Sequence, residues 1–147
     1  MPSYSIVVAA DHAGLPLKEE SVAALRELGH TVEDIGTHDG ASVDYPDYAH
    51  RAASMVEQGL HRFAVLICGS GVGMAIAANK HAGIRAVVCS EPYSAAMARR
   101  HNDANVLCMG ARVVGPGLAR EIIEAFLAQE FEGGRHARRI DKLQADS

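Results

Sequence analysis

Four short apolar runs constrain the fold more than any other feature of this 147-residue sequence. They cover residues 5–10, 63–68, 84–89 and 105–109, show no polar alternation, and end at glycine or polar residues. Strands that are apolar on both faces are typical of parallel sheets covered by helices on both sides. A weaker run at residues 31–35 adds a fifth strand. We therefore expect a five-stranded parallel sheet that is buried on both faces.

Stretches with helical spacing separate these runs. The expected helices cover residues 15–28, a segment after Pro46, and residues 72–80, 92–101, 117–129 and about 134–145. Strands that alternate with helices imply right-handed crossovers and a sheet between two helical layers. We therefore predict one α/β domain over residues 1–147, with three layers (α/β/α). The pattern leaves the strand order open.

Composition and charge exclude several classes of ligand. Tryptophan is absent and 48% of the residues are hydrophobic, so the core must be mainly aliphatic. The net charge of -4 offers no general attraction for nucleic acid or for an anionic membrane. No apolar segment approaches the length of a membrane span. We expect a soluble, cytoplasmic protein that binds neither nucleic acid nor membrane, so any anion site must be local.

A glycine-rich loop follows one predicted strand at the edge where ligands of parallel sheets bind. It reads Cys68-Gly69-Ser70-Gly71-Val72-Gly73, and its glycines let backbone N–H groups approach an anion. Its spacing is neither the dinucleotide fingerprint nor a Walker A loop. Two alternatives stay open. The glycines can serve strand-to-helix packing alone, or the loop can bind a nucleotide whose ribose is held by Glu91.

Cys68 differs from the other two cysteines by its position. It ends a strand beside the glycine loop, where N–H groups and a helix dipole favour a thiolate that can act as a base. Cys89 and Cys108 are interpreted as inert core residues. The three cysteines form no CxxC pair, so we expect free thiols. A thiol redox protein based on Cys68 is the least favoured alternative.

Two polar segments are further candidates for chemistry. Asp11 and His12 follow the first strand, but they can also belong to the N-cap region of the next helix. His101 and Asn102 end a predicted helix, where a histidine can perform acid–base chemistry near neutral pH. The alternative role for His101 is C-terminal capping of that helix.

Three arginines can form a phosphate site. Arg135 and Arg139 are four residues apart, so they share one face of a helix, and Arg112 follows a strand as a third donor. Spacing alone favours the other interpretation, an exposed basic helix, because charge runs usually lie on solvated faces.

Together these segments resemble the ribose-5-phosphate isomerase B family, which also includes galactose-6-phosphate and allose-6-phosphate isomerases. The resemblance spans nearly the whole chain. It is carried by residues 11–14, 44–46, 68–73, 77–80, 83–86, 90–94, 101–103 and 132–136.

The resemblance implies a Rossmann-like fold and a homodimer or homotetramer whose active site is shared between subunits. The C-terminal helix, with Arg135 and Arg139, would then pack on a partner subunit. The implied reaction interconverts ribose 5-phosphate and ribulose 5-phosphate through a cis-enediolate, without metal or cofactor. A six-carbon sugar phosphate is the alternative substrate.

The resemblance also assigns roles to residues. Cys68 is the base that moves a proton between C1 and C2, and His101 opens the sugar ring. The N–H groups of residues 71–73 stabilise the enediolate oxygen. Sugar and phosphate ligands are Asp11, His12, Gly69, Ser70, Gly71, Val72, Gly73, Asn102, Arg112, Arg135 and Arg139.

Overall fold

The central element of the computed structural model, which describes residues 2–145, is a sheet of five parallel strands in the order β2-β1-β3-β5-β4. The strands are β1 (Ser5–Ala10), β2 (Thr31–Asp34), β3 (Phe63–Cys68), β4 (Ala86–Val88) and β5 (Val106–Gly110). The inner strands β1, β3 and β5 are almost completely buried, as their continuous apolar runs predict.

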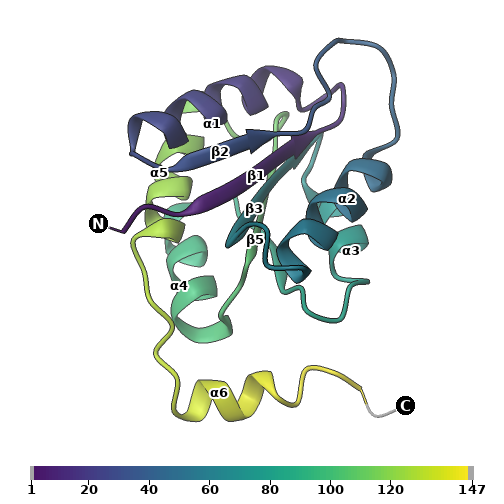
Figure 1. Ribbon diagram of the computed structural model, residues 1–147. Helices are drawn as coiled ribbons and strands as arrows, with labels where there is room; N and C mark the ends of the chain where they lie inside the picture. The colour runs from purple at the N-terminus through teal and green to yellow at the C-terminus, as the bar shows by residue number, and fades with distance from the viewer. Residues whose placement is uncertain (1, 146–147) are drawn as a thin grey trace.

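Helices cover both faces of the sheet (Figure 1). One layer holds α1 (Leu15–Glu27), α4 (Pro92–Asn102) and α5 (Pro116–Leu127), and the other holds α2 (Tyr45–Glu57) and α3 (Val72–Ala78). Alternate residues of β1 serve the two layers: Ile6 and Val8 pack in the first core, and Val7 and Ala9 in the second. The predicted three-layer α/β/α fold is confirmed.

Helix α6 (Arg135–Ile140) lies apart from the two layers (Figure 1). It follows an extended segment after α5 and contacts α4. It is shorter than the predicted helix over residues 134–145, because only turns follow Ile140 as far as residue 144. No helix within residues 2–145 combines the length and apolar character that crossing a bilayer requires.

Strand β4 is also shorter than its apolar run predicts. The side-chain amide of Asn79 bonds both backbone groups of Ala86, at 2.8 and 2.9 Å. The amide oxygen of Asn105 accepts the N–H of Arg85 at 2.8 Å. At the start of this run, backbone groups therefore form hydrogen bonds with side chains, and the strand begins only at Ala86. Asn79 is also the C-cap of α3, which therefore ends at Ala78, two residues before the predicted end at residue 80.

Candidate active site

A pocket of about 580 Å³ opens at the carboxyl edge of the sheet, where ligands of parallel sheets bind. It collects the ends of β1, β3 and β5, the start of α3, and the first residue of α2. Its lining residues are Asp11, Tyr45, Cys68, Gly69, Ser70, Val72, Gly73, Ile76, Arg112 and Val113. Six of the eleven residues predicted to touch the sugar or carry the phosphate therefore line one pocket with Cys68.

The glycine loop holds the Cys68 sulfur by a backbone donor. The N–H of Gly71 donates to Cys68 Sγ at 3.1 Å. Gly71 has a φ of +82°, and a Cβ there would lie 2.9 Å from the carbonyl carbon of Met109. Only glycine can therefore bring this N–H to the sulfur without strain. The turn between β3 and α3 is built around the thiol.

The loop differs from the predicted oxyanion cradle in one respect. The N–H of Gly71 points to the Cys68 sulfur, and the N–H of Val72 points to Ser70 Oγ at 3.3 Å. Two of the three donors expected to face the substrate thus bond side chains of their own loop. The reason is the tight turn, which brings residues 71 and 72 back over residues 68 and 70.

The other two cysteines lie in surroundings that disfavour the thiolate. Burial, together with the charge of Glu91, raises the pKa of Cys89 to about 11. Burial also raises the pKa of Cys108 well above its usual value. All three thiols are free. Of these cysteines, Cys68 is the one that lines the pocket and receives an N–H donor.

Asp11 and His12 brace loops beside the pocket. Asp11 is buried, and its Oδ1 accepts the N–H of Gly14 at 3.0 Å. Gly14 is itself the N-cap of α1, so Asp11 supports the preceding turn and does not cap the helix. The Nδ1 atom of His12 accepts the N–H of Val43 at 3.1 Å, which ties the loop over residues 37–44 to the end of β1.

Glu91 is occupied as a helix cap. It is the N-cap of α4, and its two carboxylate oxygens accept the N–H of Ser94 at 3.2 and 3.0 Å. Hydrogen bonding by the Ser94 side chain, followed by that of its backbone N–H, lowers the pKa of Glu91. The nucleotide alternative needed this carboxylate for a ribose, so the geometry argues against it.

His101 and Asn102 lie at the opposite side of the sheet from Cys68, near the amino ends of the strands. They end α4, which begins after the carboxyl end of β4 and runs back toward the start of β5. A helix of 11 residues is about 16 Å long, so this length separates them from the carboxyl edge. A second pocket of about 270 Å³ lies here. It is lined by His101, Asn102, His136, Arg139, Ile140 and Leu143, and so shares no residue with the first.

The predicted phosphate ligands are divided in the same way. Arg112 lines the Cys68 pocket, where its guanidinium packs over Gly69. Arg135 and Arg139 lie on α6, and both are exposed. One chain therefore carries the predicted site residues in two groups, which we call half-sites. The predicted base and one predicted phosphate ligand lie at the carboxyl ends of the strands, and His101 and the other two arginines lie at the amino ends.

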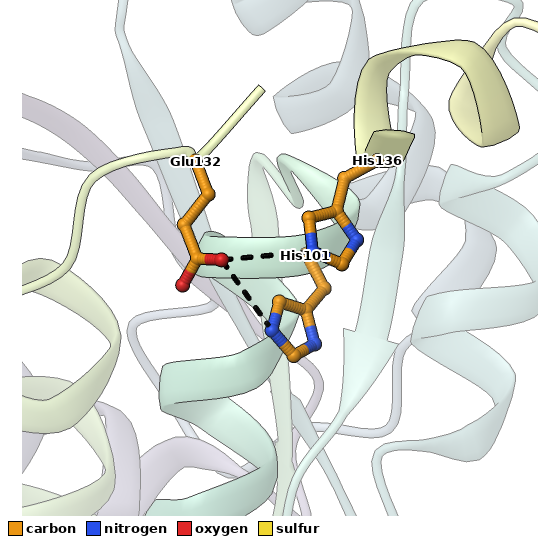
Figure 2. A group of neighbouring side chains, drawn as sticks. All are labelled: His101, Glu132 and His136. Atoms are coloured by element: carbon orange, nitrogen blue, oxygen red, sulfur yellow. Dashed lines mark ion pairs between the residues drawn. The ribbon is translucent and has the colours of Figure 1, made fainter. Parts of the chain in front are cut away.

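One cluster beside His101 was not predicted from the sequence. His136 of α6 stacks on His101, with ring centroids 4.2 Å apart and planes inclined by 11°. Glu132 Oε1 lies 3.8 Å from Nε2 of His101 and 3.6 Å from Nε2 of His136, as Figure 2 shows. Burial, followed by the charges of His101 and Arg135, lowers the pKa of His136. The residue spacing along α6 gives no sign that His136 meets α4.

The comparison with known proteins decides the family. Residues 6–143 match the family model described as Ribose/Galactose Isomerase. The chain belongs to this family. Membership confirms the prediction of an isomerase, an enzyme that performs an intramolecular oxidation and reduction.

Members of the ribose/galactose isomerase family with close similarity include the Ribose-5-phosphate isomerase B of Escherichia coli K12, which is 53% identical over 95% of this chain and 94% of its own. The D-erythrulose-4-phosphate isomerase of Pectobacterium atrosepticum is 45% identical, over 95% of this chain and 92% of its own. The structure of Clostridium thermocellum Ribose-5-Phosphate Isomerase B superposes with a TM-score of 0.93 at 48% identity, covering 95% and 94% of the two chains.

In this ribose/galactose isomerase, the end of α4 that carries His101 is held by arginines. Asp103 adopts the left-handed conformation, with a φ of +46°, and its carboxylate lies 2.8 Å from Arg99 and 3.4 Å from Arg85. Arg99 is buried and also donates to the carbonyl of Ala104 at 2.6 Å. Asp103 is thus the cap of α4, and the cap fixes the backbone from which His101 projects.

Proposed function

We propose that this ribose/galactose isomerase interconverts ribose 5-phosphate and ribulose 5-phosphate in the cytoplasm, as a step of pentose phosphate metabolism. The observation that carries the proposal is the thiol of Cys68, which faces a pocket beside Arg112 and accepts a backbone N–H from Gly71. The E. coli relative named Ribose-5-phosphate isomerase B, at 53% identity, supports the choice of a pentose phosphate.

In the proposed reaction, the Cys68 thiolate removes the proton from C2 of the open-chain aldose. The electron pair of that C–H bond forms the C1–C2 double bond of a cis-enediolate, and the former carbonyl oxygen takes the negative charge. A proton then moves from the C2 hydroxyl to the C1 oxygen, and Cys68 returns its proton to C1 as the C2 carbonyl forms, which gives the ketose. The N–H donor of Gly71 stabilises the thiolate in the ground state. No metal is needed to polarise the carbonyl.

The N–H of Gly71 can serve both charges in turn. It is directed to sulfur while the thiolate is charged, and the charge leaves sulfur when the proton arrives. The donor is then free to bond the enediolate oxygen, with the N–H groups of Val72 and Gly73 beside it. One such donor contributes about 3 kcal/mol to transition-state stabilisation.

The two half-sites support an active site formed by two chains. Around the Cys68 pocket, Val72, Ile76 and Val113 expose 50%, 58% and 61% of their surface, which is unusual for aliphatic side chains beside a polar site. A two-fold dimer whose interface covers these side chains can bring the amino edge of one chain over the carboxyl edge of the other. We propose this arrangement as a homodimer, or as a tetramer built from two such dimers.

In the proposed dimer, His101 from one chain reaches the ring oxygen of a sugar bound at the other chain's Cys68. His101 donates a proton to this oxygen as its bond to C1 breaks, and the anomeric hydroxyl releases its proton to water as the aldehyde forms. Asn102 lies beside His101. Arg135 and Arg139 of α6 join Arg112 of the partner around the phosphate. Fixing the phosphate supplies remote binding energy that holds C1 and C2 against the thiol.

The remaining predicted ligands are proposed to contact the sugar. Asp11 and the Ser70 hydroxyl line the pocket floor next to Cys68, together with Gly69, Val72 and Gly73. His12 lies just outside this lining, where it anchors the loop over residues 37–44.

The size of the sugar separates this proposal from its closest alternatives. Isomerases of allose 6-phosphate or galactose 6-phosphate would use the same base. The Pectobacterium relative is named for a four-carbon substrate, D-erythrulose 4-phosphate, at 45% identity. Each of these substrates would react by the same proposed chemistry. They differ in the volume that the sugar occupies in the site.

The decisive assay offers ribose 5-phosphate, erythrose 4-phosphate, allose 6-phosphate and galactose 6-phosphate separately to chelator-treated protein, and follows ketose formation. The Cys68→Ala protein is the matched control. The proposal predicts the highest kcat/KM for ribose 5-phosphate and its loss in the variant. A preference for another sugar phosphate would contradict the substrate, and full activity of Cys68→Ala would contradict the base.

A further inference from the structure

The cluster of His101, Glu132 and His136 has the composition of a metal site (Figure 2). Two imidazole nitrogens and one carboxylate oxygen lie within 4.8 Å of one another. Two histidines and one glutamate form a donor set that binds zinc in proteins, with a fourth position left to water or to another ligand. Of these three residues, His101 alone has a role in the proposed reaction.

Two of the three atom pairs are spaced close to what zinc requires, and the third pair, the two imidazole nitrogens, lies within 4.8 Å. With bonds of about 2.0 to 2.2 Å in a tetrahedron, ligand atoms lie about 3.4 Å apart. Glu132 Oε1 is 3.8 Å from His101 Nε2 and 3.6 Å from His136 Nε2. Contraction by a few tenths of an ångström therefore brings these pairs to coordination distance.

One ring must turn, because a zinc ion lies near the plane of each imidazole that binds it. The rings of His101 and His136 are now stacked at 11°. His101 can make this adjustment, since its side chain is 37% exposed and projects from the end of α4. His136 is buried and would keep its position.

A second observation points independently to a ligand. The Nε2 atom of His136 is buried and has no hydrogen-bond partner within the described part of the chain, and the residue is only 8% exposed. A buried polar atom without a partner costs free energy, which a bound cation would recover. This atom faces Glu132 Oε1 (Figure 2).

The Glu132 carboxylate keeps one oxygen available for a metal ion. Arg100 Nε donates to Glu132 Oε2 at 2.6 Å, so Oε1 is left toward the histidines. Outer partners of this kind orient carboxylate ligands in metal sites. The guanidinium of Arg139 lines the same pocket and opposes a cation, so the site should bind reversibly and not as a structural zinc site.

We propose that His101, Glu132 and His136 bind one zinc ion, and that zinc inhibits the isomerase by holding His101. The first half of the proposal is independent of the substrate. The second half rests on the proposed function, in which His101 opens the sugar ring. Zinc is an inhibitor in this account and takes no part in the isomerisation.

The binding test is calorimetric titration of zinc into chelator-stripped protein in a Cys68→Ser background, which removes the competing thiol. Glu132→Gln removes the charged ligand, and Glu130→Gln is the matched control, because Glu130 is exposed and lies outside the cluster. We expect one zinc per chain in the background and control proteins, and at least tenfold weaker binding in Glu132→Gln. Equal zinc affinity in Glu132→Gln and Glu130→Gln would overturn the site.

A second variant keeps the test decisive if Glu132→Gln is destabilised by the loss of its Arg100 pair. His136→Asn should also weaken zinc binding at least tenfold, and unchanged binding would refute the site. Inhibition is measured separately, in proteins that retain Cys68. For each variant, the isomerase rate with zinc is divided by the rate of the same variant without zinc. Zinc binding without loss of rate would overturn the inhibitory half. Zinc binding by a protein that turns over no sugar phosphate would contradict the proposed function and leave the site intact.

Discussion

Cys68 and His101 lie at opposite edges of one sheet, although both are proposed to act on the same substrate. Cys68 ends β3 at the carboxyl edge, and His101 stands at the end of α4, which runs antiparallel to the strands. Each therefore lines its own pocket. The proposed dimer would resolve the separation, because a two-fold axis can bring the two unlike ends together twice.

The role of His101 predicts a dependence on whether the substrate forms a ring. Ribose 5-phosphate closes to a furanose, whereas erythrose 4-phosphate has no free hydroxyl that can close one. His101→Ala should reduce kcat/KM about 100-fold on ribose 5-phosphate, as expected for a lost general acid, and much less on erythrose 4-phosphate. Steady-state kinetics on both sugars checks this. Equal losses would remove the ring-opening role, and Cys68→Ala is the control that should lose both activities.

The three cysteines should differ in their reaction with iodoacetamide at about pH 8, because the thiolate is the reactive form. Cys68 faces a pocket and accepts an N–H, whereas burial raises the pKa of Cys89 to about 11 and raises that of Cys108 well above its usual value. Mass mapping should show Cys68 labelled first, with protection by ribose 5-phosphate. Labelling of Cys89 as fast as Cys68 in the folded protein would contradict the account of the site.

Stability should depend strongly on an ion pair between a buried lysine of α1 and a half-buried aspartate of β2. Lys18 is 1% exposed, and its Nζ lies 2.5 Å from Asp34 Oδ2. Asp34→Ala leaves this charge buried without a partner, so we expect a loss of about 3 kcal/mol in the free energy of unfolding. Lys18→Met, which replaces the charge with an apolar chain, should cost less.

Urea unfolding measures both variants of this pair. The control is Glu33→Ala, which removes the preceding, exposed carboxylate and should cost less than about 1 kcal/mol. A loss in Asp34→Ala no larger than that in Glu33→Ala would show that Lys18 finds its stabilisation elsewhere.

Much of the fold follows from local pattern in the sequence. Residues 5–10 and 63–68 are strands because apolar side chains on both faces suit only a covered parallel sheet, and these bounds are confirmed. The start of β4 could not be predicted, since it depends on amide side chains of Asn79 and Asn105 that reach it from other elements.

The site was predictable to a similar extent. The rule that ligands bind at the carboxyl ends of strands selected Cys68 and Arg112, which do share a pocket. The stacking of His136 on His101 was not predictable, because it depends on how α6 packs on α4 and leaves no periodic signal. The same packing brings Glu132 to the two histidines.

The most direct test of the two-chain site mixes two inactive proteins. Cys68→Ala and His101→Ala are unfolded together, refolded, and assayed with ribose 5-phosphate. Random pairing makes half of the dimers mixed, and each mixed dimer holds one intact site of two, so about one quarter of wild-type activity should return. Activity no higher than the sum of the two variants refolded separately, while mixed dimers are present, would contradict an active site shared between subunits.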